Sequence, residues 1–121
     1  MYHIFYETRF AAAHHLQGYN GMCSELHGHT WKVRVEIKAD QKDEIGISFD
    51  FKKLKSITGK VIDRLDHHYI NEVPPFDKKN PTAENLAEYF FHEVGILLPK
   101  TVAMSKVIVW ESESYGVSFE G

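Results

Sequence analysis

The sequence predicts a single α+β domain in which a four-stranded antiparallel sheet carries two helices on one face. Apolar and polar residues alternate near both ends of the chain, whereas two central segments repeat apolar residues at helical spacing. The predicted order is therefore strand, strand, helix, helix, strand, strand. The length agrees, because 121 residues without an internal repeat or a linker make one domain, residues 1–121.

The first two strands are predicted from alternation. Residues 2–10 alternate between two faces, and the pattern continues through residues 11–13 toward His14. Residues 17–24 contain two glycines and an asparagine, which indicates a loop. Residues 28–38 then alternate again, so we expect a second strand that runs antiparallel to the first.

The first helix is predicted from Lys52 to Leu65, where apolar residues recur at helical spacing. Residues 47–51 form either a short strand or the entry to this helix. Gly59 weakens the helix by about 1 kcal/mol relative to alanine. We expect the helix to end near residues 66–68.

The second helix is predicted to begin at Thr82, a good N-cap, with Glu84 in its first turn, and to end before Pro99. Residues 107–110 form a continuous apolar strand, and residues 115–119 form a short last one. A sheet of four strands leaves its edges open. Since open edges pair with other chains, we expect an oligomer.

Composition excludes several classes of protein. The formal net charge is −3 and no basic run is present, which argues against nucleic-acid binding. No apolar run approaches the roughly 18 residues of a membrane span. The N-terminus lacks the basic start of a signal peptide and carries Glu7 early. The single cysteine cannot form an internal disulfide. We therefore expect a cytoplasmic protein.

The most informative motif runs from Cys23 through His27 to His29. In a strand, side chains two residues apart point to the same side, so both imidazoles can share a metal ion. Trp31 continues the same face. A catalytic zinc takes three protein ligands, and His14 at the end of the neighbouring strand is the best third ligand.

The residue next to His14 has opposite parity. His15 should point away from the metal if the strand is regular, and a bulge there would exchange the two roles. Cys23 is either a fourth zinc ligand or a base or nucleophile. The carboxylate of Asp66 can orient the imidazole of His67 and stabilise its charged form, although neighbours in sequence need not touch.

Six motifs together resemble the 6-pyruvoyl-tetrahydropterin synthase family, most closely its bacterial 6-carboxy-tetrahydropterin synthase branch. The resemblance covers essentially the whole chain. Each motif alone is weak, but all six occur in the family's order. They are Phe10-Ala-Ala-Ala-His14, Cys23-x-x-x-His27-Gly-His29, Phe49-Asp50-Phe51 with Leu54-Lys55, Leu65-Asp66-His67-His68-Tyr69-Ile70-Asn71, Pro81-Thr82-x-Glu84-Asn85-Leu86 and Trp110-Glu111-Ser112.

The resemblance implies a tunnelling fold, with subunits assembled into a barrel, usually a hexamer made of two stacked trimers, and active sites at subunit interfaces. It assigns residues as follows: zinc ligands His14, His27 and His29; catalytic thiol Cys23 with the relay Asp66 and His67; pterin anchor Glu111; pocket-lining Thr82. His15 replaces an expected arginine. Some relatives use a glutamate near the position of Glu25 in place of the cysteine, but the cysteine is present here, so Glu25 is secondary.

The implied substrate is 7,8-dihydroneopterin triphosphate. The 6-carboxy branch releases 6-carboxy-tetrahydropterin, acetaldehyde and triphosphate on the route to queuosine. The alternative is 6-pyruvoyl-tetrahydropterin, on the biopterin route. Two other classes remain: a zinc- or pterin-binding scaffold without catalysis, and a zinc hydrolase that uses a metal-bound water and has no need of a thiol. Replacing Cys23 by alanine separates thiol catalysis from a closed structural site.

Overall fold

Two long antiparallel strands form the centre of the molecule. The computed structural model describes residues 1–18 and 27–121, with His27 described only as backbone. Strand β1 spans Tyr2–His14 and strand β2 spans His27–Ala39, and they pair along their whole lengths from Tyr2 opposite Ala39 to His14 opposite His27. Loss of register by one residue would move every side chain to the other face of the sheet.

The remaining elements include the predicted ones in the predicted order, with two short elements between the helices. They are helix α1 (Phe51–Ile62), strand β3 (His68–Tyr69), the short 3-10 helix η2 (Ile70–Glu72), helix α2 (Ala83–Leu97), strand β4 (Ala103–Trp110) and strand β5 (Gly116–Phe119). All four predicted strands and both predicted helices are present. Residues 47–50 are not a strand and lead into α1. The predicted α+β fold class is confirmed.

The sheet has five strands in the order β3-β1-β2-β4-β5. The four longer strands pair with one another antiparallel, as predicted. The two-residue strand β3 was not predicted, and it pairs in parallel with β1 at Ala12 and Ala13. It covers the outer edge of β1 only near the end that carries His14.

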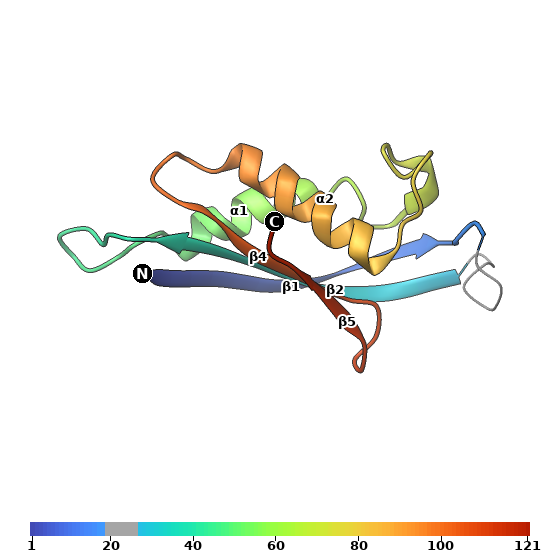
Figure 1. Ribbon diagram of the computed structural model, residues 1–121, viewed down its shortest axis with the longest axis horizontal. Helices are drawn as coiled ribbons and strands as arrows, with labels where there is room; N and C mark the ends of the chain where they lie inside the picture. Colours follow the sequence, from blue (N-terminus) through green and yellow to red (C-terminus); the bar gives the residue numbers. More distant parts are fainter. Residues whose placement is uncertain (19–26) are drawn as a thin grey trace.

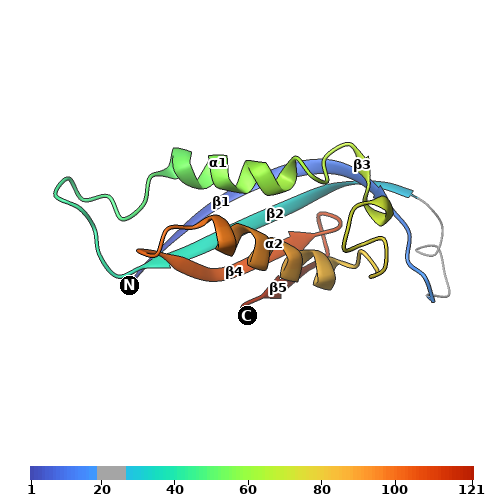
Figure 2. The ribbon, with the colours of Figure 1, turned by 90° about the horizontal axis from the view of Figure 1, so that it is seen from above.

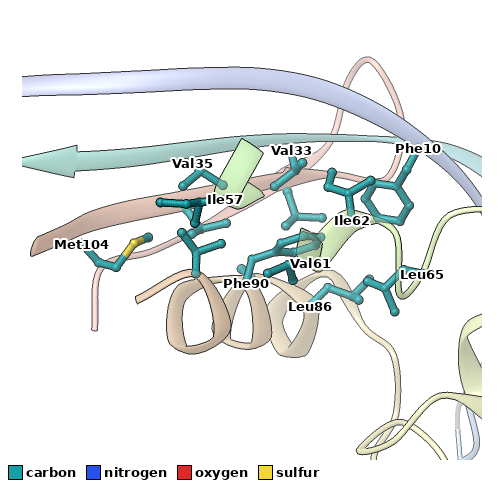
Figure 3. Close-up of a cluster of buried hydrophobic side chains, with 14 of the residues drawn as sticks. Phe10, Val33, Val35, Ile57, Val61, Ile62, Leu65, Leu86, Phe90 and Met104 are labelled. Carbon is teal, nitrogen blue, oxygen red and sulfur yellow. The ribbon is translucent and has the colours of Figure 1, made fainter. Parts of the chain in front are cut away.

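Both helices cover one face of the sheet (Figures 1 and 2). Alternation along β2 makes this face apolar, since Trp31, Val33, Val35 and Ile37 are fully buried. Figure 3 shows Val33 and Val35 of β2 facing the inner sides of the two helices, where Ile57 of α1 and Phe90 of α2 lie. The two layers bury one continuous hydrophobic core.

The opposite face of the sheet is polar. Glu7 on β1 lies 3.3 Å from the Lys32 ammonium and 3.5 Å from the Arg34 guanidinium, both on β2. The Arg34 guanidinium also lies over the ring of Phe5. The sheet therefore presents one apolar face to its helices and one charged face.

Helix α1 ends earlier than predicted. Its N-cap is Asp50, whose side chain accepts a hydrogen bond from the backbone N–H of Lys52. We expected an end near residues 66–68, but the last helical residue is Ile62. Beyond it, the N–H of Leu65 bonds the carbonyl of Ile62, a tighter pairing than in an α-helix. These turns bring the following residues to the edge of β1 while Leu65 stays buried.

Helix α2 begins as predicted. The hydroxyl of Thr82 accepts a hydrogen bond from the N–H of Asn85 at 3.1 Å, which satisfies one of the helix's unpaired N-terminal donors. Neither helix, nor any other in the described part of the chain, is long and apolar enough to cross a membrane.

Thr58 on α1 provides a test of the core. Its side chain is fully buried, and its hydroxyl has no hydrogen-bond partner among the described residues. Because valine has the same shape without the unsatisfied hydroxyl, Thr58→Val should raise the free energy of unfolding by about 1 kcal/mol. Thr58→Ala, which leaves a cavity, should lower it. Chemical denaturation measures both, and a destabilised valine variant would contradict the packing described for this helix.

Candidate metal and catalytic site

The imidazole of His14 is held in one orientation. It lies at the end of β1 with a side-chain exposure of 1%. Its Nδ1 is 2.9 Å from the backbone carbonyl of Pro81. A carbonyl only accepts hydrogen bonds, so Nδ1 carries the proton and donates it. The other ring nitrogen, Nε2, is then the atom available as a metal ligand.

Two further side chains meet this nitrogen. His29 lies on β2, and Glu111 follows directly after β4. The Glu111 carboxylate oxygen is 3.0 Å from Nε2 of His29 and 3.4 Å from Nε2 of His14. The cluster therefore draws one residue from each of three adjacent strands or strand ends, on the helix-covered side of the sheet. His29 and Glu111 are partly exposed, at 23% and 31%, so this side of the cluster is open to a ligand.

A tryptophan fixes the two rings. The ring centroid of Trp31 lies 4.9 Å from that of His14 and 5.3 Å from that of His29, with the ring planes at steep angles in both cases. The two imidazoles are also edge to face with each other at 5.0 Å. These geometries are favourable for aromatic pairs. Since Trp31 is fully buried, it forms a rigid wall behind the cluster.

The donor set suits a metal ion. The ligand atoms of His14, His29 and Glu111 all lie within 4.8 Å of one another. Imidazole nitrogen and carboxylate oxygen are usual zinc donors, and a hydrogen bond from the second ring nitrogen to a carbonyl is typical of metal-binding histidines. The backbone register also sets His27 opposite His14. Cys23 lies outside the described residues, as does the side chain of His27.

The predicted pair Asp66 and His67 is in contact, with 3.0 Å between the carboxylate and Nδ1. The same carboxylate oxygen accepts a hydrogen bond from the N–H of Ala11 at 2.9 Å. This bond, reinforced by His67, lowers the pKa of Asp66, so it remains ionised at neutral pH. The pair lies on the outer edge of β1, on the other side of that strand from β2, and the His67 side chain is 80% exposed.

His67 also has an unusual backbone. Its φ of 60° lies in the left-handed region, which L-residues other than glycine adopt at a cost. The conformation is held by a hydrogen bond from its N–H to the carbonyl of Ala11. Such strain at a polar, exposed residue is typical of functional positions.

The structure thus brings some predicted residues together and separates others. His14, His29 and Glu111 form one cluster, and Asp66 and His67 form a second group at the sheet edge. Thr82 caps α2 directly after Pro81. The ring of His15 lies outside the cluster and meets the hydroxyl of Tyr69. The sequence assigned Glu111 to the substrate and did not indicate its contact with the imidazoles. Nor did any pattern indicate the Pro81 carbonyl, because a backbone acceptor leaves no mark on residue type.

Comparison with known proteins gives a consistent result. The family model for 6-pyruvoyl tetrahydropterin synthase matches residues 3–121. A dihydroneopterin monophosphate aldolase of Pyrococcus furiosus is 33% identical and is matched over 97% of this chain and 96% of its own length. A 6-carboxy-5,6,7,8-tetrahydropterin synthase of Haemophilus influenzae is 31% identical over 93% and 94%.

Solved structures agree on the fold. The 6-pyruvoyl tetrahydropterin synthase of Caenorhabditis elegans superposes with a TM-score of 0.90, covering 99% of this chain and 95% of that one at 24% identity. At this identity the likeness shows the fold alone. It confirms the predicted tunnelling fold of the subunit.

Two substitutions of His67 test its backbone. Alanine is normally more favourable than glycine, but a left-handed residue reverses that order because glycine has no Cβ. His67→Gly should therefore exceed His67→Ala in free energy of unfolding by about 1 kcal/mol. Both variants lack the ring, so its contacts cancel in the comparison. Thermal and urea denaturation measure the difference, and an alanine variant of equal or greater stability would contradict the left-handed conformation.

Proposed function

Since the chain belongs to the 6-pyruvoyl tetrahydropterin synthase family, it is a pterin enzyme of the lyase type, and we propose that it is a zinc-dependent 6-carboxy-tetrahydropterin synthase. Its substrate would be 7,8-dihydroneopterin triphosphate. With one water consumed, the products would be 6-carboxy-tetrahydropterin, acetaldehyde and triphosphate, on the route to queuosine. Relatives named for this activity, from Haemophilus influenzae and Synechocystis, support the proposal at 31% and 34% identity.

The observation that carries the proposal is the oriented His14 imidazole beside His29 and Glu111. We assign His14, His27 and His29 as the zinc ligands. When bound, zinc would supply Lewis acidity that lowers the pKa of the C–H and O–H groups on the substrate side chain. Binding would cost little ordering of the two rings, since Pro81 holds the His14 ring and Trp31 packs against both rings before any metal arrives.

Protons would then be moved by the chain's own groups. We assign Cys23, as thiolate, to remove a proton from the substrate side chain, and His67 to act as general acid or base at the pterin ring carbon. Asp66 would keep the His67 ring in place. The lowered pKa of Asp66 supports this role, because the carboxylate must remain ionised to do it.

We further propose that Glu111 accepts hydrogen bonds from the amino group and ring N–H of the pterin, with Thr82 lining the same pocket. The carboxylate is partly exposed and lies beside the two imidazoles. This position would hold the pterin ring next to the metal. Thr82 follows Pro81, which contacts His14, so it lies at the same end of the sheet.

The two groups of residues lie on different parts of the sheet, the metal cluster on its helix-covered face and the relay pair at one edge, which supports a site shared between subunits. The relay pair is on the outer edge of β1, and the exposed His67 ring is free to reach a neighbouring copy. We propose a homohexamer made of two trimers, in which one copy supplies the metal ligands and another supplies Asp66 and His67.

A second activity has specific support. The alignment with the Pyrococcus furiosus aldolase has 117 positions and spans nearly all of both chains, whereas that with the Haemophilus influenzae synthase has 134, more than this chain contains. The aldolase therefore matches without the insertions of the synthase. An aldol cleavage of dihydroneopterin monophosphate would break the bond between the first two side-chain carbons. It would release a hydroxymethyl-dihydropterin and glycolaldehyde phosphate.

Product identification tests these activities. Zinc-loaded protein should convert 7,8-dihydroneopterin triphosphate, under anaerobic conditions, to 6-carboxy-tetrahydropterin and acetaldehyde, both detected by mass spectrometry. Cys23→Ala should lose turnover by at least about a hundredfold, as expected for removal of a general base, and retain its zinc.

Other outcomes each point to a different function. A 6-pyruvoyl product would place the chain in the biopterin branch. Cleavage of the monophosphate alone would establish the aldolase. Unchanged substrates, with zinc still bound, would indicate a binding scaffold. If Cys23→Ala also loses zinc, the thiol is a metal ligand and the site is a closed structural one.

Glu111→Gln separates two roles for this carboxylate. A charge-assisted hydrogen bond contributes about 1.5–3 kcal/mol, so loss of the pterin anchor should lower kcat/KM by roughly 10- to 100-fold. Zinc affinity, measured by competition with a chromophoric chelator, should stay near that of the unchanged protein. Weaker zinc binding with an unaltered KM would instead identify Glu111 as a metal ligand.

A further inference from the structure

Backbone hydrogen-bonding groups along the outer edge of β1 pair with side chains as well as with a strand. At Ala11, the backbone N–H donates to Asp66 and the carbonyl accepts from the N–H of His67. Strand β3 then pairs with Ala12 and Ala13. Beyond the end of β1, the chain continues along the same edge through residues 15–17, where no strand in the described part of the chain pairs with it on that side.

Two asparagine amides occupy this edge in place of a strand. Asn71 accepts a hydrogen bond from the N–H of His15 at 2.9 Å and donates one to the carbonyl of the same residue at 3.1 Å. Asn80 does the same for Gln17, at 3.0 and 2.8 Å. Each amide thus pairs with both backbone groups of one residue, as a neighbouring strand would.

These clamps bind the segment that directly follows the oriented histidine. Asn71 binds the residue after His14, and Asn80, which binds Gln17, directly precedes Pro81, whose carbonyl accepts the hydrogen bond from Nδ1 of His14. Asn80 is itself fixed, because its carbonyl accepts a hydrogen bond from the Asn85 side chain at 2.8 Å. The segment that directly follows His14 is therefore tied by Asn71 to η2, and by Asn80 to the loop whose Pro81 carbonyl orients the His14 ring.

We propose that Asn71 and Asn80 are positioning residues for the metal site, acting through the segment that directly follows His14 and through the loop that orients its ring. The inference rests on the proposed metal site and names residues that the site itself does not contain. Asparagine fits the role because its side chain carries a donor and an acceptor at the length of a backbone amide. Aspartate has the same shape but only accepts, so it would set its second oxygen against a carbonyl.

The test is metal binding by the purified full-length protein, with Co²⁺ alone as the probe. The variants are Asn71→Asp, Asn80→Asp and the uncharged Asn71→Ala and Asn80→Ala. Loss of a residue that orients a metal ligand typically weakens binding 10- to 100-fold, so the Co²⁺ dissociation constant should rise by about tenfold, with a changed visible absorption spectrum. The carboxylate that each aspartate variant adds would by itself attract the cation. Weaker Co²⁺ binding in these variants would therefore be due to altered geometry of the metal ligands and not to the change in charge.

Two controls make the result decisive. Ile57→Val, in the core of α1, lowers stability without touching this edge, and it should bind Co²⁺ like the unchanged protein at a comparable melting temperature. His14→Ala should abolish tight binding. If the asparagine variants melt lower but keep the original affinity and spectrum, the clamps are structural only and the inference is wrong. If His14→Ala binds as tightly as the unchanged protein, the proposed metal site itself fails, and the inference with it.

Discussion

The unbroken pairing of β1 with β2 determines both the two faces of the sheet and the geometry of the candidate site. Thirteen residues of β1 lie opposite thirteen residues of β2 without a shift in register. The register gives the sheet an apolar face for the helices and a charged face, and it aligns His14 with the strand that carries His29. A slip of one residue would expose Trp31 and dismantle the histidine cluster together. Stability and site geometry therefore depend on the same set of hydrogen bonds.

Much of the fold could be predicted because it is local. Alternation along β1 and β2, helical spacing in the middle of the chain and the Thr82 cap each depend on residues close in sequence. The errors arose where a distant partner decides the conformation. Helix α1 ends at Ile62 because the following residues must reach Ala11 on β1, and the two-residue β3 forms only because that edge is there.

The site was predictable to the extent that it depends on residue type and parity. The spacing of His27 and His29 and the position of His14 at a strand end follow from period-two geometry. Contacts that join segments far apart in the chain cannot be predicted from this geometry. The approach of Glu111 to the imidazoles depends on where β4 ends, and the left-handed backbone of His67 occurs at a residue type that gives no hint of it. The two asparagine clamps are equally invisible, because an asparagine in a loop usually signals a turn.

The carbonyl of Pro81 gives the His14 ring its orientation, and a main-chain atom cannot be removed by substitution. Substitution of Pro81 by another residue would leave the carbonyl in place, and Nδ1 of His14 would still donate to it. A change in the path of the loop before α2 would redirect the ring even if every ligand were kept. Relatives that preserve all the histidines can therefore differ in the orientation of this ring through loop length alone, and a designer who grafts the cluster of His14, His29 and Glu111 onto another sheet would have to carry this loop along with it.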